Sequence, residues 1–182
     1  MDEKRCSLDG PDEFQHYCHD LRKDPKVISR RPQGGGGAMV WGATFYSGAV
    51  EIIFIEGSLN AQKYLEIIGN VKGVIQNQMG MENFVLQQDN ASTHNVRVVK
   101  HCLEQSETTL LLWSPFSSDL NIIENVRGWL SRRIYSGGKQ FINNEQLKLA
   151  IREAWEGLPL EYINNLFNSL PNRMLRGNEE ER

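Results

Sequence analysis

The chain has 182 residues, of which 40% are hydrophobic and 24% charged, and its formal net charge is −3. This composition is typical of one globular domain with a real core, and no apolar run approaches the ~20 residues that a membrane helix needs. The slightly acidic balance argues against a dedicated DNA-binding module, which usually carries a basic excess. A metal-dependent nuclease core remains compatible with it, because its carboxylates serve to bind cations.

The N-terminus and the cysteines indicate the type of compartment. The residues after Met1 are charged rather than apolar, so we expect no signal peptide and an intracellular protein. Cys6, Cys18 and Cys102 are odd in number and lack the spacing of zinc ligands, which predicts reduced thiols.

The first part of the chain predicts a three-stranded antiparallel unit. Residues 2–8 are expected to form a strand, because apolar and charged side chains alternate there. Two apolar runs, 38–46 and 49–56, flank Ser47-Gly48, which suits a tight hairpin. A loop excursion, residues 9–37, separates the first strand from this hairpin and contains a basic stretch, four consecutive glycines and a short extended segment at Phe14–His19.

The remainder of the chain alternates between helical and extended patterns. Helices are predicted at residues 60–79, 96–104, 119–135, 144–155 and 161–170, and strands at 84–88 and 110–113. Gly137-Gly138 is expected to break the chain, and Pro171 to end the last helix. The charged tail, residues 176–182, is expected to be disordered.

The order of these elements predicts the fold class. The sequence β-β-β-α-β-α-β-α, followed by C-terminal helices, suits an α/β domain with a ribonuclease-H-like mixed five-stranded sheet and helices on both faces. We expect residues 1–136 to form this core and residues 137–175 to form a helical extension of the same domain.

Two carboxylates in this pattern suggest a metal site. Asp89 follows a predicted buried strand at its carboxyl end, where open α/β sheets bind their ligands. Glu124 lies about one turn into a predicted helix, on the face that also carries Asn121 and Gly128. Together these carboxylates form two parts of an oxygen-ligand metal site, which still requires a third.

The same residues carry a resemblance to a known family. Asp89-Asn90-Ala91-Ser92-Thr93-His94 resembles the D-N-A-x-x-H motif of Tc/mariner transposases, and residues 117–125 resemble their S-P-D-L-N-P-I-E-N motif. The thirty-four residues between Asp89 and Glu124 match the spacing in the Tc-like branch. Asp2-Glu3-Lys4 resembles the segment with that family's first catalytic Asp, and the resemblance runs over nearly the whole chain, including Met39-Val40-Trp41-Gly42-Ala43.

The resemblance implies a catalytic domain that cuts and joins DNA with Mg²⁺ or Mn²⁺, two ions per site. Asp2, Asp89 and Glu124 would be both the catalytic residues and the metal ligands, with Asp89 bridging the ions and no covalent enzyme intermediate. Further contacts to DNA or to the active site are expected from Asn90, His94, Asn121, Arg30, Arg31, Arg132 and Arg133. For several of these a structural explanation stays open: His94 as a surface histidine, Arg30 and Arg31 in a solvated loop, Arg132 and Arg133 at a helix C-terminus.

The resemblance also implies the partners. DNA is the expected partner, as transposon ends and as target, together with a homodimer in the nucleus. No membrane and no small-molecule cofactor are expected.

The sequence departs from the family pattern in several places. Ser118 and Ile122 stand where the family has prolines, and Arg127 stands where it usually has Trp, which affects local packing. The first strand begins abruptly at Asp2, without the family's upstream half-strand, and the family's helix-turn-helix region is missing from the sequence.

Two alternative functions stay open, and these departures motivate the first of them. One is a catalytically decayed or domesticated fragment that binds DNA or a partner without chemistry. The other is a ribonuclease-H-like nuclease that acts on RNA–DNA hybrids.

Overall fold

The computed structural model describes residues 1–10, 36–81, 84–88, 96–106, 108–111 and 120–180. The extended segment expected at Phe14–His19 therefore lies outside the described residues. So do the candidate site residues Arg30, Arg31, Asp89, Asn90 and His94.

The central sheet is antiparallel and has the strand order β1-β2-β3. Its strands are β1 (Asp2–Ser7), β2 (Gly37–Phe45) and β3 (Gly48–Ile55), which agrees with the predicted three-stranded unit. Gly48 begins β3 with a φ of 144°, so the hairpin uses a backbone conformation that favours glycine. At the other end of β2, a Cβ on Gly37 would lie 2.6 Å from the backbone oxygen of Cys6, so only glycine allows this close approach.

A second, smaller sheet pairs β4 (Val85–Leu86) with β5 (Thr109–Leu110) in parallel. The prediction of one five-stranded sheet is therefore wrong for the described residues, which form sheets of three and two strands. The reason is that the beginning of β1 lies near the end of β4. The nitrogen of Met1, just before β1, donates to the carbonyl oxygen of Gln87, just beyond β4, at 3.1 Å. The described residues of β1 and β4 form no ladder with each other, and this hydrogen bond joins the residues that flank them.

The helices follow the predicted order. They are α1 (Ala61–Met79), α2 (Arg97–Gln105), α3 (Ile122–Ile134), the short 3₁₀ helix η2 (Ser136–Gly138), α4 (Asn144–Glu156) and α5 (Leu160–Glu180). Asn60 and Asn143 cap α1 and α4, each accepting a hydrogen bond at 2.9 Å from a backbone N–H three residues later.

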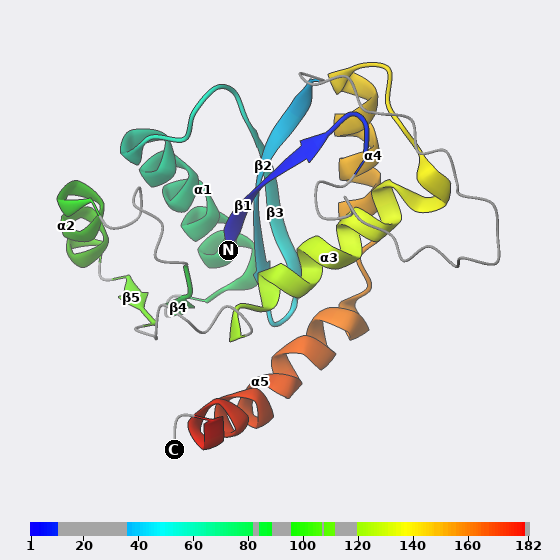
Figure 1. Ribbon diagram of the computed structural model, residues 1–182. Helices are drawn as coiled ribbons and strands as arrows, with labels where there is room; N and C mark the ends of the chain where they lie inside the picture. Colours follow the sequence, from blue (N-terminus) through cyan, green and yellow to red (C-terminus); the bar gives the residue numbers. More distant parts are fainter. Residues whose placement is uncertain (11–35, 82–83, 89–95, 107, 112–119, 181–182) are drawn as a thin grey trace.

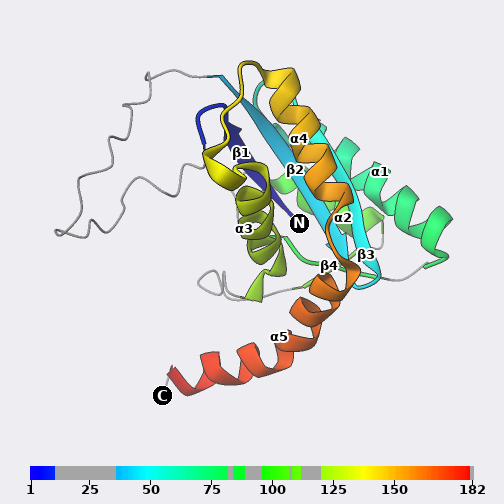
Figure 2. The same ribbon diagram turned by 90° about the vertical axis from the view of Figure 1, so that its right-hand side faces the viewer.

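Two helix ends differ from prediction. Helix α3 begins at Ile122 rather than near Asp119, and its first backbone bond runs from the Glu124 N–H to the Asn121 carbonyl at 3.0 Å. Helix α5 includes Pro171 and continues to Glu180, so the expected end of the helix at Pro171 is wrong. Proline removes one helical hydrogen bond and can kink a helix without ending it, and α5 bends along its length in Figure 2.

Helices cover both faces of the central sheet, as predicted (Figures 1 and 2). Side chains alternate along β2, so Trp41 and Ala43 pack in a cluster with α1 and α2, whereas Ala38 and Val40 pack with α3 and α4. A third cluster joins the buried face of α3 to α5, where Ile163 is fully buried. The start of α3 is thereby fixed between the sheet and the C-terminal helices.

The structure also bears on the state of the cysteines and on membrane-spanning helices. Cys6 and Cys102 are free thiols, and Cys18 lies outside the described residues. Within the ranges that the structure describes, no helix is long and apolar enough to cross a membrane.

Core packing through α4 gives a direct test of this architecture. Leu147→Ala should lower the free energy of unfolding by about 2–5 kcal/mol, because Leu147 is fully buried and its truncation leaves a cavity. Leu149→Ala, on the same helix but 58% exposed, should change it by less than about 0.5 kcal/mol. Urea unfolding of both variants measures the difference, and equal losses would contradict the packing described for α4.

Candidate active site

Asp2 lies on the α3 side of the sheet, at the beginning of β1. Alternation along the strand puts Asp2, Lys4 and Cys6 on one face, where all three line a small pocket beneath α3. Asp2 is only 6% exposed, although it carries a carboxylate. Burial of a charge is costly unless the charge is paired, so the partners of Asp2 define the site.

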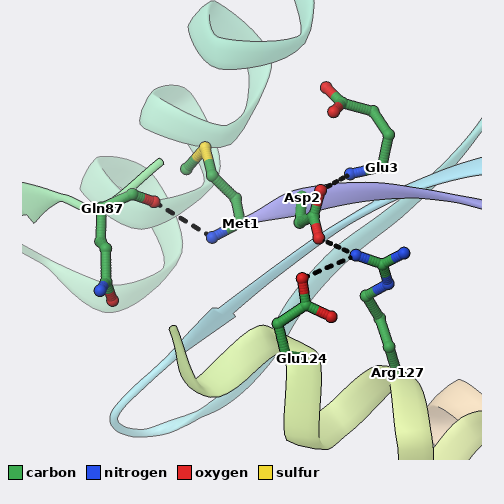
Figure 3. A network of polar contacts seen from close by, with 6 residues as sticks. All are labelled: Met1, Asp2, Glu3, Gln87, Glu124 and Arg127. Atoms are coloured by element: carbon green, nitrogen blue, oxygen red, sulfur yellow. Dashed lines mark hydrogen bonds and ion pairs between the residues drawn. The ribbon is translucent and has the colours of Figure 1, made fainter. Parts of the chain in front are cut away.

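Both carboxylate oxygens of Asp2 accept hydrogen bonds (Figure 3). Oδ1 accepts from the backbone N–H of Glu3 at 2.6 Å. Oδ2 accepts from Nη1 of Arg127, which reaches down from α3. The same Nη1 donates to Oε1 of Glu124 at 3.0 Å. One nitrogen therefore links a strand carboxylate to a helix carboxylate.

The sequence of α3 explains why these groups meet. Ile122, Ile123 and Val126 are buried and fix which face of the helix packs inward. Glu124 and Arg127, three residues apart, then project together from the side next to β1. The side chain of Arg127 is 23% exposed and that of Glu124 is 45% exposed, so the site opens toward solvent at Glu124.

The predicted meeting of Asp2 and Glu124 is thus observed. Each contributes an oxygen that contacts one cationic nitrogen, so the pair converges on a single point that carries positive charge. Two carboxylates of this kind fit a hard divalent cation, which prefers oxygen ligands and keeps several waters. Within the described ranges, no group of three acidic, histidine or cysteine side chains could hold a metal, and Asp89 lies outside those ranges.

The segment that leads to position 89 is anchored beside the site. Gln87 accepts from the Met1 nitrogen through its carbonyl and donates through Nε2 to the Leu120 carbonyl at 3.2 Å. The Tyr64 hydroxyl of α1 bonds to Oε1 of Gln88. The last two described residues before Asp89 are therefore held by β1, α1 and the approach to α3.

The other described candidates lie apart from the carboxylate pair. Asn121 is buried, and its Oδ1 has no hydrogen-bond partner among the described residues. It faces a pocket with Met1 and Gln87, so it does not share the half-exposed environment of Glu124. Arg132 and Arg133 are exposed in the last turn of α3, where their charge suits the helix dipole.

Arg127 is the residue whose role the sequence did not reveal. It was expected to affect packing, whereas the structure places its guanidinium between Asp2 and Glu124. The available signal was its spacing of three residues from Glu124 on one helix, which favours an ion pair.

The fold and this site define a class of protein. A mixed α/β domain that brings carboxylates from separate elements to one cation position is typical of metal-dependent phosphoryl-transfer domains. The model of the DDE superfamily endonuclease family matches residues 1–148, and the chain belongs to this family.

Curated relatives are transposases of nematodes. The chain is 36% identical over 174 residues to the Tc3 transposase of Caenorhabditis elegans, which covers 96% of the chain and 53% of the relative. It is 30% identical over 140 residues to the Tc1 transposase of the same species, covering 77% of the chain and 50% of the relative. The chain therefore spans about half the length of these relatives, and the Tc/mariner relationship predicted from its motifs is confirmed.

Solved structures agree on the fold. The Mos1 transposase paired-end complex with left transposon end matches with a TM-score of 0.80 at 20% identity, over 94% of this chain and 51% of that chain. The Mos1 transposase catalytic domain with Raltegravir and Mg matches with a TM-score of 0.63 at 20% identity, over 75% and 71%. The predicted mixed α/β class is thereby confirmed, although the sheet is divided.

Charge removal at the two carboxylates should have unequal effects on stability. Asp2→Asn should lower the free energy of unfolding by about 1–3 kcal/mol, because a buried charged pair loses one member. Glu124→Gln should cost at most about 1 kcal/mol, because Glu124 is half exposed and solvent screens its pair.

Chemical denaturation in the presence of EDTA measures both values. A larger loss for Glu124→Gln than for Asp2→Asn would contradict the burial that distinguishes the two carboxylates.

Proposed function

We propose that this chain is the catalytic domain of a Tc/mariner-like DNA transposase that hydrolyses and transfers phosphodiester bonds with Mg²⁺ or Mn²⁺. The observation that carries the proposal is the convergence of Asp2 and Glu124 on one cation position, in a chain whose family is that of the DDE endonucleases. Transposases among its relatives and structural neighbours support the same substrate class.

Asp2, Asp89 and Glu124 would be the catalytic residues and would hold two divalent ions. Asp2 is fixed by the Glu3 N–H and by its place on β1, whereas Glu124 comes from α3 and is open to solvent. Asp89 would supply the third carboxylate, and the anchoring of Gln87 and Gln88 beside Met1 and Tyr64 supports its place there. When bound, the ions activate the attacking oxygen and stabilise the departing one.

The remaining candidates would contact DNA around this centre. The exposed Arg132 and Arg133 would bind backbone phosphates from the end of α3. Asn90 and His94 would border the reacting phosphate, and Arg30 and Arg31 would contact DNA or a second subunit, whereas the buried Asn121 would support the start of α3 rather than contact DNA. Transposon ends and target DNA would be the partners, with assembly as a homodimer and action in the nucleus; a neighbouring Mos1 structure is itself a paired-end complex.

A second candidate function follows from Arg127. Its guanidinium lies where the carboxylates would hold a cation, which favours a decayed site that binds DNA or a partner without chemistry. In that function Asp2 and Glu124 would serve only as ion-pair partners that join β1 to α3.

DNA nicking separates the two functions. With Mn²⁺, the chain should nick short DNA duplexes, and Asp2→Ala, Asp89→Ala and Glu124→Ala should each reduce the rate by about 10²-fold or more, because each removes a metal ligand. Glu145→Ala removes an exposed carboxylate of α4 and should leave the rate unchanged.

The comparison is made by gel electrophoresis of labelled duplexes at equal protein concentration. Equal nicking by the wild-type chain and Asp89→Ala would remove the enzymatic function and favour the binding function. An RNA–DNA hybrid in the same assay tests the alternative function, a ribonuclease-H-like nuclease that acts on such hybrids.

A further inference from the structure

We infer that Arg127 is an internal cation that occupies the metal position of the unloaded site and must leave it before a divalent ion is held. Arg127 would then be the residue that sets the metal affinity of this chain. The inference rests on the proposed function, because it requires that Asp2 and Glu124 are metal ligands. It concerns a residue that stands where the family usually has a tryptophan.

The geometry of the contact supports this role. Nη1 alone contacts Oδ2 of Asp2 and Oε1 of Glu124, so one positively charged atom lies between both carboxylates. A metal ligated by the same two oxygens would need that position. Arg127 and a divalent ion are therefore mutually exclusive in this arrangement.

The contact also differs from a permanent structural ion pair. Arginine holds a carboxylate most strongly through two parallel N–H···O bonds from its planar fork. Here a single nitrogen serves both carboxylates, and Nε of Arg127 is buried without a hydrogen-bond partner among the described residues. An unsatisfied buried donor makes the present position less favourable than a fully bonded one.

The side chain has a way out of the site. Arg127 is 23% exposed, and Glu124 beside it is 45% exposed, so the guanidinium can move toward solvent along the surface of α3. Its long flexible stem permits this movement while the backbone of α3 stays packed through Ile123 and Val126. Asp2, which is buried on a strand, cannot follow it.

The charges at the site predict how removal of the Arg127 guanidinium changes the affinity for a divalent cation. Two carboxylates with the guanidinium carry a net charge of −1, and without it they carry −2. Removal of the guanidinium therefore raises the attraction for a divalent cation and abolishes the hydrogen bonds that the cation must break. The same removal leaves the two carboxylates unneutralised in the unloaded protein, which should lower its thermal stability.

Calorimetric titration with Mn²⁺ tests the inference. Arg127→Gln and Arg127→Met should each bind Mn²⁺ about tenfold or more tightly than the wild-type chain, because a charge-assisted hydrogen bond is worth about that factor. Arg127→Lys keeps the charge and should stay close to wild type. Arg152→Gln makes the same charge change at an exposed position of α4, over Phe54, and should not alter the affinity.

A thermal-shift measurement gives a second observable. The Arg127→Gln and Arg127→Met variants should melt below wild type in EDTA and show a larger upward shift on addition of Mn²⁺. Addition of Asp2→Asn to Arg127→Gln should abolish the gain in affinity, which locates the bound ion at this pair of carboxylates.

The possible results separate this inference from the proposed function. Equal Mn²⁺ affinities for wild type, Arg127→Gln and Arg127→Met would overturn the inference and leave the metal site intact. Binding by wild type that is lost in both variants would overturn it as well, because Arg127 would then support the ligands. Absence of binding in every variant would overturn both the inference and the proposed metal-dependent chemistry.

Discussion

The burial of the Asp2 carboxylate is the constraint on which the rest of the site depends. Alternation along β1 turns this side chain toward α3, where solvent cannot stabilise its charge. The Glu3 N–H and the Arg127 guanidinium provide that stabilisation from the strand and from the helix. The charge therefore joins the sheet to α3, and the elements that build the core also build the site.

Much of this arrangement could be predicted from local patterns. The two-residue period of β1 and the helical period of α3 predict which side chains of each element face the core, whereas the meeting of Asp2 with Glu124 was implied only by the resemblance to Tc/mariner transposases. The order of the elements and the placement of helices on both faces followed from the same periodicities. These are properties of a few neighbouring residues, which is why single-sequence reasoning could reach them.

The features that the sequence did not predict depend on contacts between residues that lie far apart in the chain. Whether β4 joins β1 in one ladder depends on where Met1 meets Gln87, and no local pattern encodes that meeting. Pro171 removes one hydrogen bond from α5, but a helix that is already packed through Ile163 and Leu166 can continue beyond it. The role of Arg127 likewise depends on Asp2, which precedes it by 125 residues and is not part of its local pattern.

The contact of Arg127 shows why carboxylate positions alone do not define an enzyme. Oxygens that converge on one point attract any suitable cation, and they bind a guanidinium by the same electrostatics that hold a divalent metal. The two occupants differ in their chemical consequences: a metal retains open positions for water and phosphate, whereas an arginine stabilises the pair without activating anything. A transposase domain and an inert remnant could therefore share this backbone, this core and both carboxylates. The two differ in whether the Arg127 side chain leaves the position between the Asp2 and Glu124 carboxylates when a divalent ion binds. Its buried Nε has no partner among the described residues, and the neighbouring Glu124 side chain is 45% exposed, so both features favour an Arg127 side chain that moves away when a metal ion binds.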